Sequence, residues 1–180
     1  MNEILKNMDP EKRDRIINAS LEEFGRNTFE KASTNNIVKK AGISKGLLFH
    51  YFENKKGLRD YLESYVIRTV ISTLQSELDW EETDFFNRLK QVAMIKGRLT
   101  FRFPYIFEFF TNIIESMDYD KLLKYRDEFA PGLMEKIYTH NIDYTKFKDG
   151  LDMEKVMKMI NWVIEKYSLE LLETLKKTKG

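Results

Sequence analysis

Residues 33–58 read STNNIVKKAGISKGLLFHYFENKKGL, and this stretch decides the fold that we expect for the chain. Ser33 or Thr34 can cap a short helix that runs to about residue 40, because a side-chain oxygen at a helix start accepts a free backbone N–H. A three-residue turn follows, in which Gly42 can adopt the left-handed backbone that the turn needs. Ser44 then caps a further short helix, which we expect to end near residue 52.

Two short helices joined by such a turn form a helix-turn-helix, whose second helix enters the major groove of DNA by its N-terminal residues. This geometry offers a physical reason for a glycine at position 46. Glycine inside a helix costs about 1 kcal/mol relative to alanine, but at the second position of a groove helix it removes a side chain that would hold the backbone away from DNA. The alternative is that Gly46 merely occupies a frayed helix start.

Basic residues gather in the same segment, although the formal net charge of the chain is only +1. Residues 31–59 hold seven lysines and arginines against one acid, whereas residues 60–180 hold 18 bases and 21 acids. A basic patch confined to one segment is typical of phosphate contact. Chance clustering on a solvated surface is the alternative.

The apolar residues recur with a period near 3.6 along almost the whole chain, which contains three prolines, so we predict an all-α fold. Asp9 caps the first helix, with Pro10 at its first position, and Asn54 caps a long fourth helix. Further helices are expected over about 83–101, 104–116, 120–141 and 152–177. No linker separates the halves, so the fourth helix belongs to both.

The run over residues 33–58 resembles the DNA-binding signature of TetR-family transcriptional regulators, and FGRNTFEKAS at residues 24–33 matches that family too. The resemblance covers about the first 60 residues; the remainder is similar only in being helical and of similar size. It implies a three-helix helix-turn-helix DNA-binding domain, residues 1–57, joined by the long fourth helix to a helical effector-binding and dimerisation domain, residues 58–180.

The resemblance also implies which residues contact DNA: Ser33, Thr34, Ser44, Lys45, Gly46, Leu47, Phe49, His50, Tyr51 and Lys55. Ser33 and Thr34 would bond a phosphate at the start of their helix. Lys45 would reach a guanine edge or a phosphate. Lys55 would bind the DNA backbone on the far side, unless it is an ordinary surface lysine.

Two positions depart from the family pattern. Leu47 replaces a common threonine, so it can touch a thymine methyl group but cannot donate a hydrogen bond. Phe49 replaces a tyrosine and lacks one hydroxyl that would bond phosphate, while Tyr51 keeps the other. His50 would flank the groove wall beside Phe49, its alternative being a histidine on the helix surface.

Residues 101–117, FRFPYIFEFFTNIIESM, form the most aromatic part of the chain. An aromatic stripe usually belongs to a domain core. The sharper alternative is a cavity for an apolar effector, with Glu108 available for a cationic one; its other candidate residues are Phe103, Phe107, Phe110, Tyr138 and Trp162.

The last helix has two apolar stripes. We expect the first, which includes Val163, Ile164 and Tyr167, to bury against its own domain, and the second, which includes Met159 and Trp162, to form an interface. The resemblance implies a homodimer through the last two helices. Eight helices are predicted, one fewer than is common in the family. The sequence therefore leaves undecided which helix joins the last one in the dimer interface.

The sequence therefore predicts a homodimeric, ligand-responsive transcriptional regulator in the cytoplasm, namely a repressor released from a palindromic double-stranded operator by a small apolar or amphipathic effector. A helix-turn-helix protein that acts through protein contacts is the alternative. An enzyme is disfavoured because the chain has no cysteine, two distant histidines and no nucleophile or phosphate-loop motif. We expect no cofactor, metal site, signal peptide or membrane span.

Overall fold

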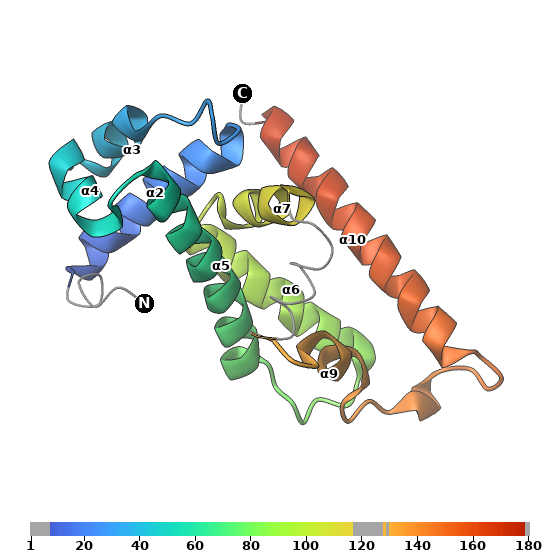
Figure 1. The fold of residues 1–180 in the computed structure, drawn as a ribbon. Coiled ribbons are helices and arrows are strands. Elements are labelled where there is room, and N and C mark those ends of the chain that lie inside the picture. Colours follow the sequence, from blue (N-terminus) through green and yellow to red (C-terminus); the bar gives the residue numbers. More distant parts are fainter. Residues whose placement is uncertain (1–7, 117–127, 129, 179–180) are drawn as a thin grey trace.

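The computed structural model describes residues 8–116, 128 and 130–178, and this part of the chain is helical without any strand (Figure 1). The all-α prediction is thereby confirmed. No helix in the described ranges is long and apolar enough to cross a membrane. The elements are α2 (Pro10–Arg26), α3 (Thr34–Ala41), α4 (Lys45–Phe52), α5 (Lys55–Glu77), α6 (Phe85–Arg102), α7 (Ile106–Ser116), α9 (Leu133–Thr139), the 3-10 helix η1 (Tyr144–Lys146) and α10 (Met153–Thr178).

Short-range capping bonds start the N-terminal helices where the sequence predicts them. The Asp9 carboxylate accepts the Lys12 N–H at 2.8 Å, the Ser44 hydroxyl accepts the Leu47 N–H at 3.1 Å, and the Asn54 side chain accepts the Gly57 N–H at 2.9 Å. Each bond satisfies a backbone donor that the first helical turn leaves free. Gly42 ends α3 with φ +66°, the left-handed conformation predicted for the turn.

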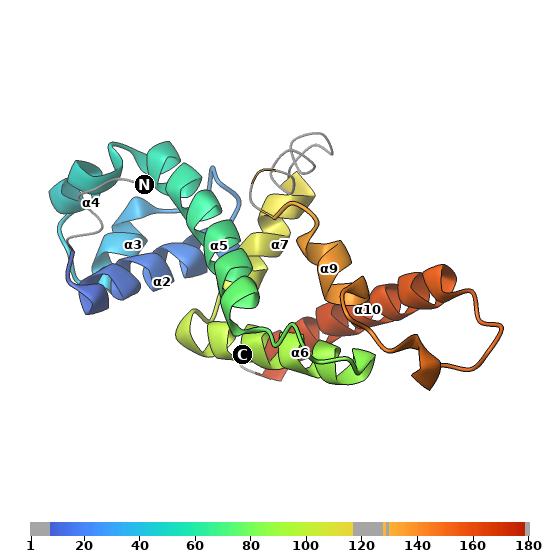
Figure 2. The ribbon, with the colours of Figure 1, turned by 90° about the horizontal axis from the view of Figure 1, so that it is seen from below.

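One apolar core extends through both halves of the molecule, because α5 contributes to each. Leu58, Leu62 and Val66 are fully buried, and Val70 and Leu74 continue the same stripe toward α6. Figure 2 shows α5 running from the group of α2, α3 and α4 to α6. The N-terminal helices close around their own fully buried residues, which include Leu21, Ile37, Ala41 and Leu48.

The α6–α7 corner supplies the core of the second half. Phe103, Ile106, Phe109 and Ile113 are buried, and α7 packs against both α2 and α5. α7 has two neighbouring apolar stripes, and the one with Ile106, Phe109 and Ile113 faces the core. Phe107 lies on the neighbouring stripe and is half-buried.

The C-terminal part departs from the sequence expectation. Of the helix predicted over residues 120–141, residues 120–127 and 129 lie outside the described residues, and α9 occupies its last portion. The prediction that the first stripe of the last helix is buried was wrong for Val163, Ile164 and Tyr167, whose exposed fractions are 67%, 37% and 65%. α10 lies on the side of the molecule opposite to α3 and α4 (Figure 1, Figure 2), and between residues 153 and 167 none of its described side chains is buried.

Candidate nucleic-acid interface

The second helix of the turn motif, α4, is held by one face and leaves the other free. Leu48 and Phe52 are buried in the core, at i and i+4. Ser44, Lys45 and Gly46 are exposed at the N-terminus of α4, where a groove helix meets base edges. The burial of one stripe thus orients the helix and presents its first turn outward.

The aromatic residues of α4 form the border of this exposed face. Phe49 and Tyr51 are half-buried and pack against the core, and the Lys45 ammonium lies 5.9 Å from the centre of the Phe49 ring. His50 is exposed, with its ring 5.5 Å from that of Tyr51 in an edge-on arrangement. Leu47 is half-buried. The structure therefore exposes Ser44, Lys45, Gly46 and His50 and leaves Leu47, Phe49 and Tyr51 half-buried.

The N-terminus of α3 is the second region predicted to contact DNA. Ser33 is its N-cap residue but makes no side-chain capping bond, and Thr34 is its first residue; both are half-buried. Within the described ranges, no acceptor is found for the hydroxyl groups of these two residues. Backbone and hydroxyl donors at a helix start suit a phosphate group.

A buried carboxylate, which the sequence analysis missed, holds this corner together. Glu23 on α2 is 7% exposed, and it accepts the Ser33 N–H at 2.8 Å and the side-chain amide of Asn36 at 3.3 Å. One signal was available: Glu23 lies seven residues after Ile16 and three after Ser20, on the apolar stripe of α2. An acid at a core position implies buried hydrogen-bond partners.

Lys55 already has partners in the structure. Its ammonium donates to the carbonyl oxygen of Glu30 at 3.2 Å and lies 4.8 Å from the centre of the Phe29 ring. Arg59 covers the same ring at 5.4 Å. Lys55 thus ties the loop between α2 and α3 to the start of α5, and its contact with the DNA backbone stays a prediction.

Comparison with known proteins agrees with this geometry. Residues 16–62 match the family model described as "Bacterial regulatory proteins, tetR family". The HTH-type transcriptional regulator BetI of Yersinia pestis (strain Pestoides F) is 32% identical over 71 residues, which is 39% of this chain and 36% of that protein. BetI of Pectobacterium carotovorum subsp. carotovorum (strain PC1) is 32% identical over 90 residues, or 50% and 46%.

A solved structure is similar over more of the chain. It is the crystal structure of a TetR family transcriptional regulator from Chloroflexus aurantiacus, with a TM-score of 0.52 and 26% identity over 70% of this chain and 59% of that one. The family model, the BetI relatives and this structure together support membership of the TetR family. The chain spans less than half of the length of these curated relatives, and the match to the family model falls on α2, α3, α4 and the first part of α5.

The residues predicted to bind an effector are distributed over separate places. Phe103 is fully buried beside Tyr65, with ring centres 5.9 Å apart, whereas Trp162 on α10 is 66% exposed. Tyr138 is half-buried, with its ring 6.3 Å from that of Phe85. The other candidates, Phe107, Glu108 and Phe110, are half-buried on α7. The described residues do not bring this set together around one cavity.

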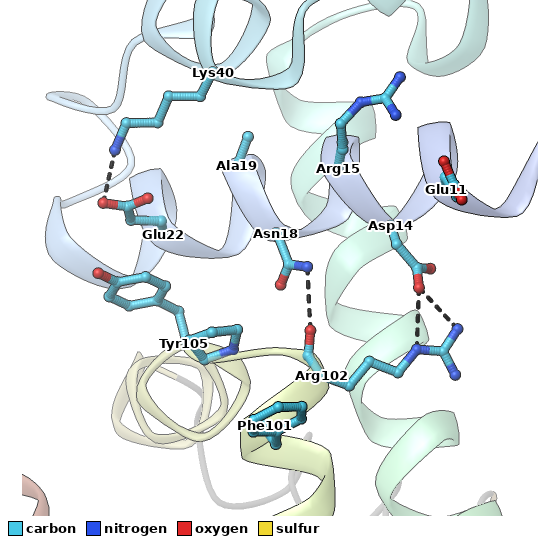
Figure 3. A pocket seen from close by; sticks show the side chains of 11 residues that line it. Glu11, Asp14, Arg15, Asn18, Ala19, Glu22, Lys40, Phe101, Arg102 and Tyr105 are labelled. Carbon is cyan, nitrogen blue, oxygen red and sulfur yellow. Dashed lines mark hydrogen bonds and ion pairs between the residues drawn. The ribbon is translucent and has the colours of Figure 1, made fainter.

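An open pocket of about 510 Å³ lies instead at the junction of the two halves (Figure 3). Arg102 donates to the Asp14 carboxylate through two nitrogens, at 2.9 and 3.0 Å, and the Asn18 side chain donates to the Arg102 carbonyl oxygen at 3.2 Å. These bonds bridge α2 and the α6–α7 corner. The lining residues are Glu11, Asp14, Arg15, Asn18, Ala19, Glu22, Lys40, Phe101, Arg102, Pro104 and Tyr105.

A second hollow, of about 320 Å³, follows one face of α5. Burial raises the pKa of Tyr61 to about 12, and burial likewise raises the pKa of Tyr65, whose ring stacks on that of Tyr61 at 5.8 Å. Both phenols therefore stay neutral at physiological pH. The lining residues are Tyr61, Ser64, Tyr65, Arg68, Thr69 and Ser72.

Proposed function

We propose that this protein is a DNA-binding transcriptional regulator, namely a homodimeric repressor that leaves a palindromic operator when a small apolar or amphipathic effector binds. The observation that carries the proposal is the exposed first turn of α4, with Lys45 beside Gly46, and the free donors at the N-terminus of α3 support it. A groove helix and a phosphate clamp on one surface are what a helix-turn-helix needs. Operator DNA would place the protein in the cytoplasm.

The exposed apolar face of α10 supports a dimer. Met159, Trp162 and Val163 are 61%, 66% and 67% exposed, and side chains of this kind on one helix favour burial against a partner. In a two-fold dimer that reads successive major grooves, the two copies of α4 would lie about 34–36 Å apart. A palindromic operator follows from that symmetry.

Release of the operator would require the second half to move α2 or α5. We place the boundary of the DNA-binding domain at residue 57 and assign residues 58–180 to effector binding and dimerisation. The Asn112 side chain on α7 donates to the Gly25 carbonyl oxygen at 2.7 Å, so a shift of α7 would be transmitted to α2 as well as to α5. An effector acts only by binding one of the two arrangements more tightly.

A helix-turn-helix that acts through protein contacts is the second candidate. Phe49 lacks a hydroxyl that could bond phosphate, and Lys55 is engaged with the Glu30 carbonyl oxygen. This candidate predicts no steep salt dependence of DNA binding. A DNA reader predicts that log affinity falls against log salt by roughly 0.9 per phosphate neutralised.

The test is selection of bound sequences from random duplex DNA by the purified protein. We expect enrichment of a palindrome, its loss in Lys45→Ala, and its retention in Lys90→Ala, which removes an exposed base on α6. A folded protein that enriches no sequence and shows no salt-dependent binding would refute the proposal and favour protein contacts.

A further inference from the structure

Glu23 is a buried acid that lies outside the exposed DNA-facing surface, yet its hydrogen bonds reach that surface. We propose that Glu23 is a positioning residue for DNA binding: it holds the N-terminus of α3 so that Ser33 and Thr34 stay free to contact a phosphate. This proposal rests on the proposed DNA-binding function.

The hydrogen bonds of Glu23 converge on the start of α3 from another helix. Oε1 accepts the Ser33 backbone N–H at 2.8 Å, both carboxylate oxygens accept Asn36 Nδ2 at 3.3 Å, and Asn27 Nδ2 adds a contact at 3.4 Å. None of the ion pairs found among the described residues involves Glu23. Its charge is therefore balanced by N–H donors, which fix its geometry because each has one direction.

This arrangement is a capping box supplied from outside the helix. In the usual capping box, the residue at the third helical position accepts the backbone N–H of the N-cap residue. Here the third position of α3 is Asn36, and its side chain donates to Glu23 instead of accepting from Ser33. The Glu23 carboxylate takes the place of that acceptor and links α3 to α2.

The consequence concerns the groups that stay unpaired. Within the described ranges, no acceptor is found for the Ser33 hydroxyl, the Thr34 hydroxyl or the backbone N–H groups of Thr34 and Asn35. The Asn36 N–H, which a capping hydroxyl would satisfy, donates instead to the Ser33 carbonyl oxygen at 3.1 Å, so the Ser33 hydroxyl is not used as a cap. It can turn to a phosphate oxygen without loss of an existing bond.

The experiment measures the affinity of the full chain for a duplex of random sequence, about 30 base pairs long, at low salt, because phosphate contacts act on any sequence. Glu23→Leu removes every acceptor, and we expect about tenfold weaker binding. Glu23→Gln keeps one oxygen for the Ser33 N–H, and we expect a loss of about threefold at most. Ile17→Val, which removes a methyl group from the α2 core, controls for a general loss of stability.

The decisive measurement is a double-mutant cycle with Ser33→Ala. If Glu23 acts through Ser33, Ser33→Ala weakens binding by about threefold in the wild type and has almost no effect once Glu23 is leucine. A purely structural role for Glu23 would leave the effect of Ser33→Ala unchanged in both backgrounds, and that result would overturn the proposal. If Glu23→Leu does not fold, Glu23→Gln takes its place in the double-mutant cycle with Ser33→Ala.

The failures of the two proposals are distinguishable. A folded wild-type protein without salt-dependent binding to the duplex refutes the DNA-binding function, and the positioning role with it. Wild-type binding that Glu23→Leu leaves unchanged refutes only the role of Glu23.

Discussion

Replacement of Gly46 by alanine tests whether α4 is a groove helix, because protein stability and DNA affinity should then change in opposite directions. Gly46 is the second residue of α4 and is exposed, and a Cβ added there would have the Ser44 hydroxyl oxygen as its nearest neighbour, at 4.0 Å. Alanine therefore fits without strain in the protein alone. Because alanine has the higher helix propensity, Gly46→Ala should stabilise the free protein by about 0.5–1 kcal/mol, or roughly 1–4 °C in Tm.

DNA affinity should change in the other direction. On the groove face, the added methyl group separates the backbone from base edges and disrupts at least one base contact, which is worth about 1–3 kcal/mol. This corresponds to a Kd about 5- to 150-fold higher. Thermal unfolding and fluorescence anisotropy with the selected duplex would measure the two effects on the same sample.

Gly97→Ala provides the matched control. Gly97 is an exposed glycine inside α6, and a Cβ added there meets no heavy atom within 4 Å. Its replacement should raise Tm similarly and leave DNA affinity unchanged. If Gly46→Ala binds DNA as tightly as the wild type, α4 does not approach the groove by its first turn, and Gly46 only occupies a frayed helix start.

Three further results are expected. Gly57→Ala should lower both Tm and DNA affinity, by about 1–3 kcal/mol in stability, because its Cβ would overlap the Phe52 carbonyl oxygen and displace α4; unchanged unfolding would contradict this. Trp162→Glu should give monomers in sedimentation experiments, whereas Phe86→Glu should leave the dimer intact, because Phe86 is an equally exposed aromatic residue on α6. A dimer that persists in Trp162→Glu would exclude this face of α10 as the interface. Since burial raises the pKa of Tyr61 to about 12, the stability contributed by its neutral phenol is complete below pH 10 and is lost as pH rises toward 12. Tyr61→Phe should therefore lose less stability over this pH range in thermal unfolding. An equal loss of stability in both proteins would show that Tyr61 is not its source.

Short-range signals explain why the N-terminal helices could be predicted. Asp9, Ser44 and Asn54 each cap a helix through an N–H three residues further along the chain, so the interaction is contained within four residues of sequence. The left-handed backbone of Gly42 is local in the same way. The pattern over residues 33–58 therefore predicted where α3, α4 and α5 begin.

Such local signals do not predict contacts between residues that lie far apart in the sequence. Glu23 meets Ser33 and Asn36 ten and thirteen residues away, and Arg102 meets Asp14 across 88 residues. An acid on an apolar stripe indicates that partners exist, but the packing angle between helices decides which ones. The effector residues show the same limit, because periodicity placed Phe103 and Trp162 on apolar faces without showing that one is buried and the other exposed.

By itself, the sequence determined that the chain is helical and where its N-terminal helices begin, because caps and 3.6-residue periodicity act within single helices. Only the tertiary structure decided that Glu23 supports α3, that α2 as well as α5 contacts the second half, and that both stripes of α10 carry exposed side chains, namely Met159, Trp162, Val163, Ile164 and Tyr167. Those features depend on how helices pack against one another, and the free energy of packing is a property of the assembled core rather than of any one segment.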